Sequence, residues 1–168
     1  MKFVLPAAAH EAQAKAFVQE FRDRDESQIP GDGRLAHYLR EQSYADWLAV
    51  INAPKSKVYM YFYMDEQSGE IIGVCHIRLK LESALFREAG HIGLSVRPTM
   101  RGQGYGSAML REALAFCAAN KLRDVRFTCE KTNTVSAKMI EGCGGVLLKA
   151  CYSEMFGKEV LKYQICKE

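Results

Sequence analysis

The stretch from Gly90 to Asn120 constrains the fold more than any other part of the chain. It opens with an apolar run of strand length, Ile92–Val96. Glycines at alternate positions follow: Gly102, Gly104 and Gly106. From Tyr105 onward, apolar residues recur at the i, i+3, i+4 and i+7 positions of a helix: Leu110, Ala113, Leu114 and Cys117. The spacing therefore predicts a strand, a glycine-rich loop and a helix, in that order.

The beginning of this helix is predicted to bind an anion. The first backbone N–H groups of a helix have no partner within it, and the helix dipole places partial positive charge there. Glycines before the helix allow the backbone to approach a phosphate closely. Arg101 adds a full positive charge at the same place. The motif Arg101-x-x-Gly104-x-Gly106 is therefore interpreted as a pyrophosphate site.

Two other phosphate-binding motifs fit this stretch poorly. Counted from Gly102, the third glycine of a Rossmann Gly-x-Gly-x-x-Gly motif falls on Ser107. The glycines also lie several residues beyond Val96, whereas the Rossmann motif opens directly from its strand. The Walker motif requires Gly-Lys-Ser/Thr, which this stretch does not contain.

The stretch instead resembles the GNAT superfamily of acyl-CoA-dependent N-acyltransferases. The first matching segment joins Leu94–Pro98 to Arg101–Gly106, and the second, Asn133–Ser136, lies some thirty residues downstream. The resemblance is clear from Gly69 to Gly145. It implies an N-acetyltransferase that uses acetyl-CoA as co-substrate and transfers the acetyl group directly to an amine.

Hydrophobic periodicity predicts the element order β-α-α-β-β-β-α-β-α-β-β. Strands are expected at 2–6, 58–64, 70–81, 90–96, 124–129, 146–152 and 160–166. Helices are expected at 10–25, 35–51, from 105 onward and at 134–141, with Pro54 ending the second and 82–89 left as a loop. We interpret the strand at 70–81 as half-buried, because its side chains alternate. Residues 22–26 are charged and interpreted as solvated. Trp47, at helical spacing, is interpreted as part of the core.

The resemblance implies the GNAT fold for this order of elements. That fold is α/β (α+β): a mixed, mostly antiparallel, twisted sheet of six to seven strands with about four helices on both faces. Its fourth and fifth strands run parallel and splay apart, and the resemblance places acyl-CoA in that cleft. The length of 168 residues suits a single domain, 1–168.

Composition narrows the functional classes. The net charge of +3 is too mild to suggest a nucleic-acid binder. Apolar runs are far shorter than a membrane span, and the N-terminus does not resemble a signal peptide. The six cysteines form no Cys-x-x-Cys pair, so we expect free thiols in a reducing cytoplasm. Since His10, His37 and His76 lack ligand spacing, no metal is expected.

The resemblance also assigns binding residues. The backbone of Leu94 and Val96 would contact the pantetheine arm and the thioester carbonyl. The pyrophosphate would lie against Arg101, Gly102, Gln103, Gly104, Tyr105, Gly106 and Ser107. Asn133 would bond the pantetheine chain, with Ser136 nearby. An Asn before a helix is also a common N-cap, so Asn133 can serve either purpose or both.

Catalytic groups are less clear from the sequence. His91 is the candidate base, because it enters the predicted cleft and its usual pKa suits proton transfer, although it could also point away from the cleft. Glu88 and Glu130 are weaker candidates. Many family members carry a tyrosine acid at the position occupied here by Ile140, which cannot donate a proton. Tyr152 is a possible substitute.

The acceptor amine is left open. A small-molecule amine is favoured slightly, because no stretch resembles an extended peptide-docking region. The alternatives are an enzyme that acetylates protein lysines or N-termini, a non-catalytic acyl-CoA sensor, and a Rossmann-type nucleotide-binding domain. Dimers are common in the family, so a homodimer is compatible with this sequence.

Overall fold

The computed structural model describes residues 1–53 and 57–166, and these divide into two compact units. Unit 1 comprises Met1–His76 and Leu94–Gly106, and unit 2 comprises Ile77–Gly93 and Ser107–Glu168. The strands are β1 Lys2–Val4, β2 Val58–Met64, β3 Ile71–Arg78, β4 Ile92–Val96, β5 Asp124–Glu130, β6 Val146–Ser153 and β7 Lys158–Cys166. The α-helices are α1 Glu11–Arg22, α2 Leu35–Glu41, α3 Tyr44–Asn52, α4 Ala84–Ala89, α5 Tyr105–Ala119 and α6 Thr134–Gly142. Two 3-10 turns, η1 Ala8–His10 and η2 Pro98–Met100, complete the described elements.

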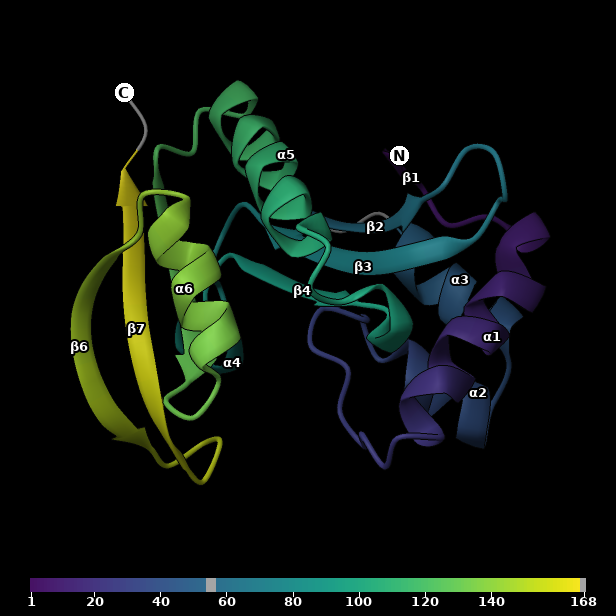
Figure 1. Ribbon diagram of the computed structural model, residues 1–168, viewed down its shortest axis with the longest axis horizontal. Helices are drawn as coiled ribbons and strands as arrows, with labels where there is room; N and C mark the ends of the chain where they lie inside the picture. Colours follow the sequence, from purple (N-terminus) through teal and green to yellow (C-terminus); the bar gives the residue numbers. More distant parts are fainter. Residues whose placement is uncertain (54–56, 167–168) are drawn as a thin grey trace. The chain divides into compact units, whose positions relative to one another are not determined.

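Unit 1 contains α1, α2 and α3 and most of a four-stranded sheet with the order β1-β2-β3-β4 (Figure 1). β1 pairs antiparallel with β2, with Phe3 opposite Tyr63. At the far edge, the Arg97 amide donates to the carbonyl of Ile72, which ties the end of β4 to β3. This sheet therefore holds β4 at an edge, where the chain leaves it for the glycine loop.

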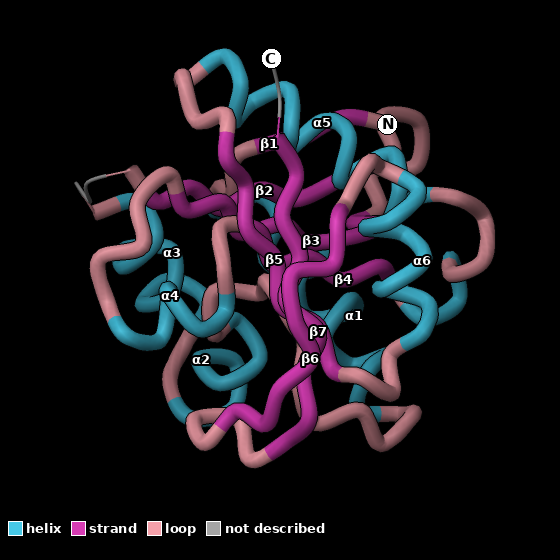
Figure 2. The backbone as a smooth tube through the Cα atoms, turned by 90° about the vertical axis from the view of Figure 1, so that its left-hand side faces the viewer, coloured by secondary structure: helices cyan, strands magenta, loops and turns pink. Residues whose placement is uncertain are grey.

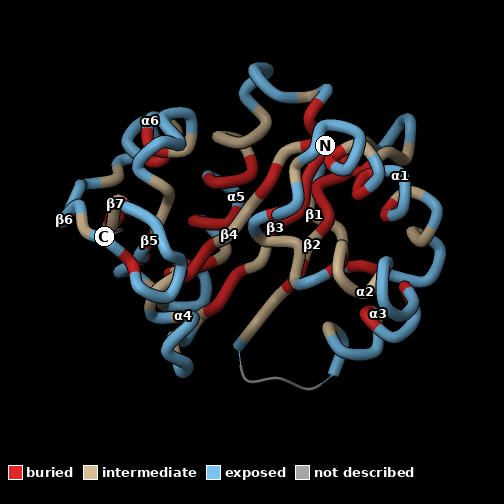
Figure 3. Tube along the Cα trace, turned by 90° about the horizontal axis from the view of Figure 1, so that it is seen from below, coloured by how far each residue is buried: buried red, intermediate tan, exposed pale blue. Residues whose placement is uncertain are grey.

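The core of unit 1 lies between its helices and strands. The buried side chains of α1 are Ala14, Phe17, Val18 and Phe21, which lie on one face at helical spacing. Trp47 of α3 is fully buried, stacks on Phe62 with ring centroids 5.7 Å apart, and donates its indole N–H to the carbonyl of Gly33. The prediction that Trp47 belongs to the core is confirmed. Figure 3 shows buried residues in red along the Cα trace.

Three expectations between residues 35 and 89 are wrong. The strand predicted at 70–81 was expected to be half-buried, but the side chains of β3 are buried on both faces, and its edges pair with β2 and β4. The helix predicted at 35–51 is two helices, since Ser43 begins α3 by accepting the Asp46 amide. The loop predicted at 82–89 contains α4, which Ser83 caps in the same way. Pro54, predicted to end the second helix, lies outside the described residues.

Unit 2 contains a three-stranded antiparallel sheet with the order β5-β7-β6 (Figure 2). β7 is its central strand, with Phe127 opposite Tyr163 on one side and Leu147 opposite Tyr163 on the other. The register with β6 shifts between Leu147 and Lys149, so β6 carries an irregularity there. α6 is bound to this sheet by the Tyr163 hydroxyl, which donates to Glu141 at 2.8 Å.

The predicted fold class is confirmed: the chain is a mixed α/β protein, with seven strands in its described residues. The strands belong to two sheets, β1–β4 and β5–β7, where one sheet was predicted. The parallel course of β4 and β5 stays a prediction. No helix among residues 1–53 and 57–166 has both the length and the apolar character that crossing a membrane would require.

Candidate active site

The glycine loop has the geometry of an anion-binding turn. Gly102 and Gly104 have φ values of +76° and +84°, in the left-handed region that favours glycine. No atom lies within 4 Å of the place where a Cβ would project from either residue. Among the described residues, the amides of Gly102, Gly104 and Gly106 have no hydrogen-bond acceptor. The loop therefore presents free N–H groups at the beginning of the 15-residue helix α5.

Arg101, predicted to add positive charge to this loop, already has an anionic partner. Its guanidinium donates to both carboxylate oxygens of Glu26, at 2.7 and 2.8 Å. It also lies over the ring of Phe21, 5.3 Å from the centroid, and donates from Nε to the carbonyl of Val96. These contacts fix the base of the loop. Residues 22–25 are exposed, as interpreted, and Glu26 is partly exposed in this ion pair.

Leu94 and Val96, whose backbone groups are predicted to contact the pantetheine arm, lie on β4 as expected and are both half-buried. Between them, the buried Ser95 points the other way and donates its hydroxyl to the carbonyl of Pro30 at 2.7 Å. Side chains alternate along a strand, so this bond fixes the face on which Leu94 and Val96 lie. Their contact with a substrate stays a prediction.

Asn133 caps the beginning of α6. Its side-chain oxygen accepts the amide N–H of Ser136 at 3.0 Å, which is the geometry of an N-cap. Both residues remain partly or fully accessible. The cap orients the amide group of Asn133, and the side-chain NH₂ is not used by the cap. The predicted contacts of Asn133 and Ser136 with pantetheine are compatible with this arrangement.

His91, the predicted base, is largely buried and linked to β5. Its Nδ1 accepts the amide N–H of Arg126 at 2.9 Å, while its own amide donates to the Arg126 carbonyl at 2.8 Å. Because Nδ1 is an acceptor, the neutral ring carries its proton on Nε2. Burial, followed by the charge of Arg126, lowers the pKa of His91 below its usual value. This geometry favours a positioning role over proton abstraction at Nδ1.

The residue before His91 must be a glycine. Gly90 has a φ of +85°, and a Cβ there would lie 2.5 Å from the carbonyl oxygen of Arg126. The close approach of the two backbones allows the pair of bonds between His91 and Arg126. Here Gly90 also forms an isolated antiparallel bridge with Phe127. This contact could not be predicted from the sequence, because its residues are more than thirty positions apart.

The position of the usual family tyrosine is a packing position in this chain. Ile140 is buried on α6 and lies against Gly145, which follows the helix. Tyr152, the predicted substitute, is exposed on β6 and lines an open pocket of about 610 Å³. Tyr152 is therefore accessible to a ligand, and its role as the acid stays a prediction.

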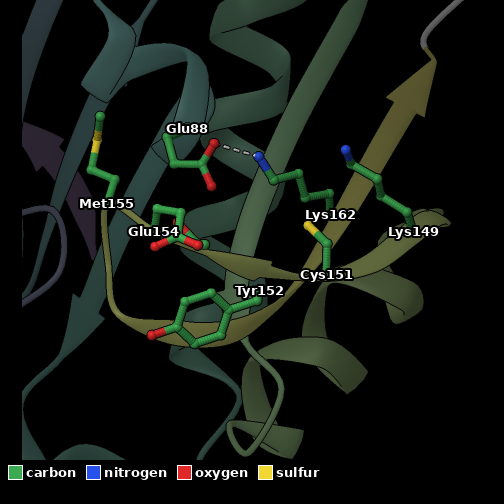
Figure 4. Close-up of a pocket in the computed structure, with 8 residues that line it drawn as sticks. Glu88, Lys149, Cys151, Tyr152, Glu154, Met155 and Lys162 are labelled. Atoms are coloured by element: carbon green, nitrogen blue, oxygen red, sulfur yellow. Dashed lines mark hydrogen bonds and ion pairs between the residues drawn. The ribbon is translucent and has the colours of Figure 1, made fainter.

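Glu88 and Glu130, the weaker base candidates, both lie in ion pairs with lysines. Glu88 bonds Lys162 at 2.6 Å inside the pocket that Tyr152 lines (Figure 4). Hydrogen bonds from Lys162, and then from Ser153, lower the pKa of Glu88. Glu130 bonds Lys158 at 2.6 Å on the surface. A carboxylate with a lowered pKa is a weak base, so Glu88 is poorly suited to that role.

Metal chemistry has no visible site in the described parts of the chain. No three His, Cys, Asp or Glu side chains are grouped there so as to hold a metal ion. The six cysteines are free thiols, and Cys75 and Cys117 are buried. Burial raises the pKa of Cys117 to about 11, which suppresses its thiolate at neutral pH.

Comparison of the fold with solved structures finds acetyltransferases over almost the whole chain. The ribosomal-protein-S5-alanine acetyltransferase from Vibrio fischeri superposes with a TM-score of 0.73 at 13% identity, covering 99% of this chain and 92% of that one. A mutant spermidine N-acetyltransferase from Vibrio cholerae gives a TM-score of 0.68 at 12% identity, covering 99% and 95%. No curated protein sequence matches the chain.

A family model decides the assignment. The model of the acetyltransferase (GNAT) family matches residues 15–144, which include the glycine loop, His91 and Asn133. The match covers well over half of the 168 residues. Because the loop geometry, the element order and this match agree, the chain belongs to the acetyltransferase (GNAT) family.

Proposed function

We propose that this protein transfers the acetyl group of acetyl-CoA to a primary amine of a small molecule by direct attack. The observation that carries the proposal is the glycine loop, whose amides at Gly102, Gly104 and Gly106 are free among the described residues at the beginning of α5. Such a loop suits a diphosphate, which coenzyme A contains. Family membership supplies the reaction type.

Acetyl-CoA would supply an activated acyl group as its thioester. In the proposed reaction, the amine nitrogen forms a bond to the acyl carbon and the C–S bond breaks. The amine loses one proton, and the coenzyme A thiolate gains one, so the step balances. The loop amides would hold the diphosphate, and Asn133 and the β4 backbone at Leu94 and Val96 would orient the pantetheine arm.

The experiment has two readouts. Calorimetric titration with coenzyme A should give one site per chain, and a panel of amines mixed with acetyl-CoA should release free thiol for at least one small amine. Absence of binding would contradict the loop assignment. Thiol release with peptides and with no small amine would instead support a protein acceptor, the class to which the ribosomal-protein enzyme belongs by its name.

One observation favours a non-catalytic alternative. Ile140 is buried where many family members carry an acid, so an acyl-CoA sensor without turnover deserves a test. This alternative predicts tight binding of acetyl-CoA and no amine-dependent thiol release with any acceptor. Solvent water can protonate a thiolate, which is why we prefer the enzyme.

A further inference from the structure

The pocket beside β6 has an unusual balance of charge. Its lining is Glu88, Lys149, Cys151, Tyr152, Ser153, Glu154, Met155 and Lys162. Two carboxylates and two ammonium groups therefore surround one open space of about 610 Å³. All of these residues belong to unit 2, so the pocket is formed within one compact unit.

Half of that charge is neutralised inside the protein. Glu88 and Lys162 are bonded at 2.6 Å, and both side chains are only about a fifth exposed. The hydroxyl of Thr128 donates to the Glu88 carbonyl at 2.6 Å, which fixes the end of α4 above β5. The Glu88–Lys162 pair is therefore a rigid part of the pocket wall, and its charges are largely satisfied.

The other two charges are available to a ligand. Among the described residues, the side chains of Lys149 and Glu154 make no hydrogen bond or ion pair, although the charge of Lys149 helps to lower the pKa of Glu88. Lys149 lies on the same face of β6 as Cys151, and Glu154 lies just beyond the strand. Figure 4 shows Lys149 beside Lys162 and Glu154 beside Glu88, so they lie near the two ends of this ion pair. The pocket thus offers one cation and one anion, near the two ends of a neutralised pair.

Resting on the proposed function, we infer that this pocket binds the acceptor and selects a molecule that carries both an amine and an anionic group, such as an amino acid. Lys149 receives the carboxylate, and Glu154 faces the amine-bearing part. Tyr152 and Met155 supply apolar surface for a side chain between them. A polyamine, which has no anionic group, would leave Lys149 facing a cation, and like charges oppose binding.

The test compares each amino acid with its own amide, because the two differ only in the carboxylate. Binding to the full chain without coenzyme A is measured by saturation-transfer NMR and calorimetry for the twenty amino acids and their amides. At least one amino acid should bind about tenfold more tightly than its amide, the size expected for a charge-assisted contact. The variant Lys149→Met should abolish this difference, and Lys149→Glu should reverse it in favour of the amide.

Lys138→Met is the matched control, since Lys138 is an exposed lysine on α6 in the same unit. It should leave the preference unchanged. Equal binding of acids and amides, no binding by any member of the panel, or equal losses for both ligands in Lys149→Met would overturn the inference. Thiol release separates the two proposals. If the protein acetylates polyamines and its binding shows no preference for amino acids over their amides, only this inference is contradicted. If amino acids bind more tightly than their amides but no amine is acetylated, only the proposed enzymatic activity is contradicted.

Discussion

Glu26 holds Arg101 by two hydrogen bonds, Oε1 to Nη1 at 2.8 Å and Oε2 to Nη2 at 2.7 Å. This two-point contact is the strong form of an arginine–carboxylate pair. It occupies the guanidinium that the motif assigned to the diphosphate. Positive charge at the loop is therefore partly cancelled, and we expect the free loop amides to provide most of the attraction for an anion.

The first prediction concerns the stability that this pair provides. The hydrogen bond from Arg101 lowers the pKa of Glu26 below its usual value of 4.5. The contribution of the pair is therefore present above pH 4.5 and is lost as the pH falls through the lowered pKa. Glu26→Gln should reduce the free energy of unfolding at pH 7 by about 0.5–1 kcal/mol, because the pair is partly exposed and screened.

Urea denaturation of both proteins between pH 7 and pH 2.5 checks this. The difference between wild type and Glu26→Gln should shrink toward zero at the acidic end. Glu154→Gln is the control, since Glu154 has no ion pair among the described residues and should change stability little at any pH. A constant difference across the whole range would mean that the Glu26 charge is not what stabilises the loop.

The second prediction concerns Gly104 in the glycine loop. Gly104→Ala forces an alanine into a φ of +84°, which costs about 1 kcal/mol, and places a methyl group in the space proposed for the diphosphate. Gly69→Ala is a matched control: its φ is +72°, its Cβ would also meet nothing within 4 Å, and it lies in the turn between β2 and β3. Both variants should lose similar stability.

Calorimetry then separates strain from binding. Only Gly104→Ala should weaken coenzyme A binding, by at least about tenfold, because the backbone can no longer approach the phosphate closely. If Gly69→Ala weakens binding as much, the loss reflects stability alone. If Gly104→Ala binds coenzyme A normally, the loop is not the diphosphate site.

The third prediction uses the link between His91 and β5. The pKa of His91 is lowered in the folded protein, so the neutral ring is favoured there. Folding stability should therefore fall as the pH drops below about 6.5, toward the lowered pKa. His91→Asn keeps an acceptor for the Arg126 amide and cannot titrate, so this part of the pH dependence should disappear. Thermal unfolding between pH 8 and pH 5 measures this pH dependence of stability. His37→Asn on α2 is the control and should leave the pH dependence in place.

The same variant tests the catalytic prediction. If His91 only positions β4 against β5, His91→Asn should retain most of its turnover at pH 8 when an active amine has been found. A loss of about a hundredfold or more in kcat at unchanged coenzyme A affinity would identify His91 as the base after all.

The sequence predicted regular elements well where periodicity is long. Alternation and β-favouring residues placed β2 at Val58–Met64, and β5 and α6 lie within one residue of their expected bounds. Short elements were missed for a physical reason. α4 has six residues, too few to show a helical period, and only the cap at Ser83 could have revealed it. The break before α3 does have a signal in the sequence. On one continuous helix, the apolar residues before Ser43 and those after it would lie on opposite faces, and a serine is a common N-cap.

The site was predictable only in its local part. Glycine spacing identified the loop, because glycines with positive φ are a property of the chain itself. Partners distant in sequence were not predictable: Glu26 lies 75 positions from Arg101, and Arg126 lies 35 positions from His91. The tautomer of His91 depends on that second contact. The residue types at the site could therefore be predicted from the sequence, but their hydrogen-bond partners could not.

The last prediction concerns the turn after α6, where the usual family tyrosine is replaced by Ile140. A Cβ on Gly145 would lie 2.8 Å from the Ile140 carbonyl oxygen and would also overlap its side chain. Gly145→Ala should therefore destabilise the protein by about 2 kcal/mol or more, measured by urea denaturation.

Gly142→Ala is the matched control, because its Cβ meets nothing within 4 Å and alanine favours the helix end. The stability of this variant should be unchanged or slightly higher. Combining Gly145→Ala with Ile140→Ala should recover part of the loss, since the side-chain overlap is removed while the carbonyl contact remains. Strict additivity of the two losses would show that Ile140 does not pack on this turn, and the position would then be free to accept a tyrosine.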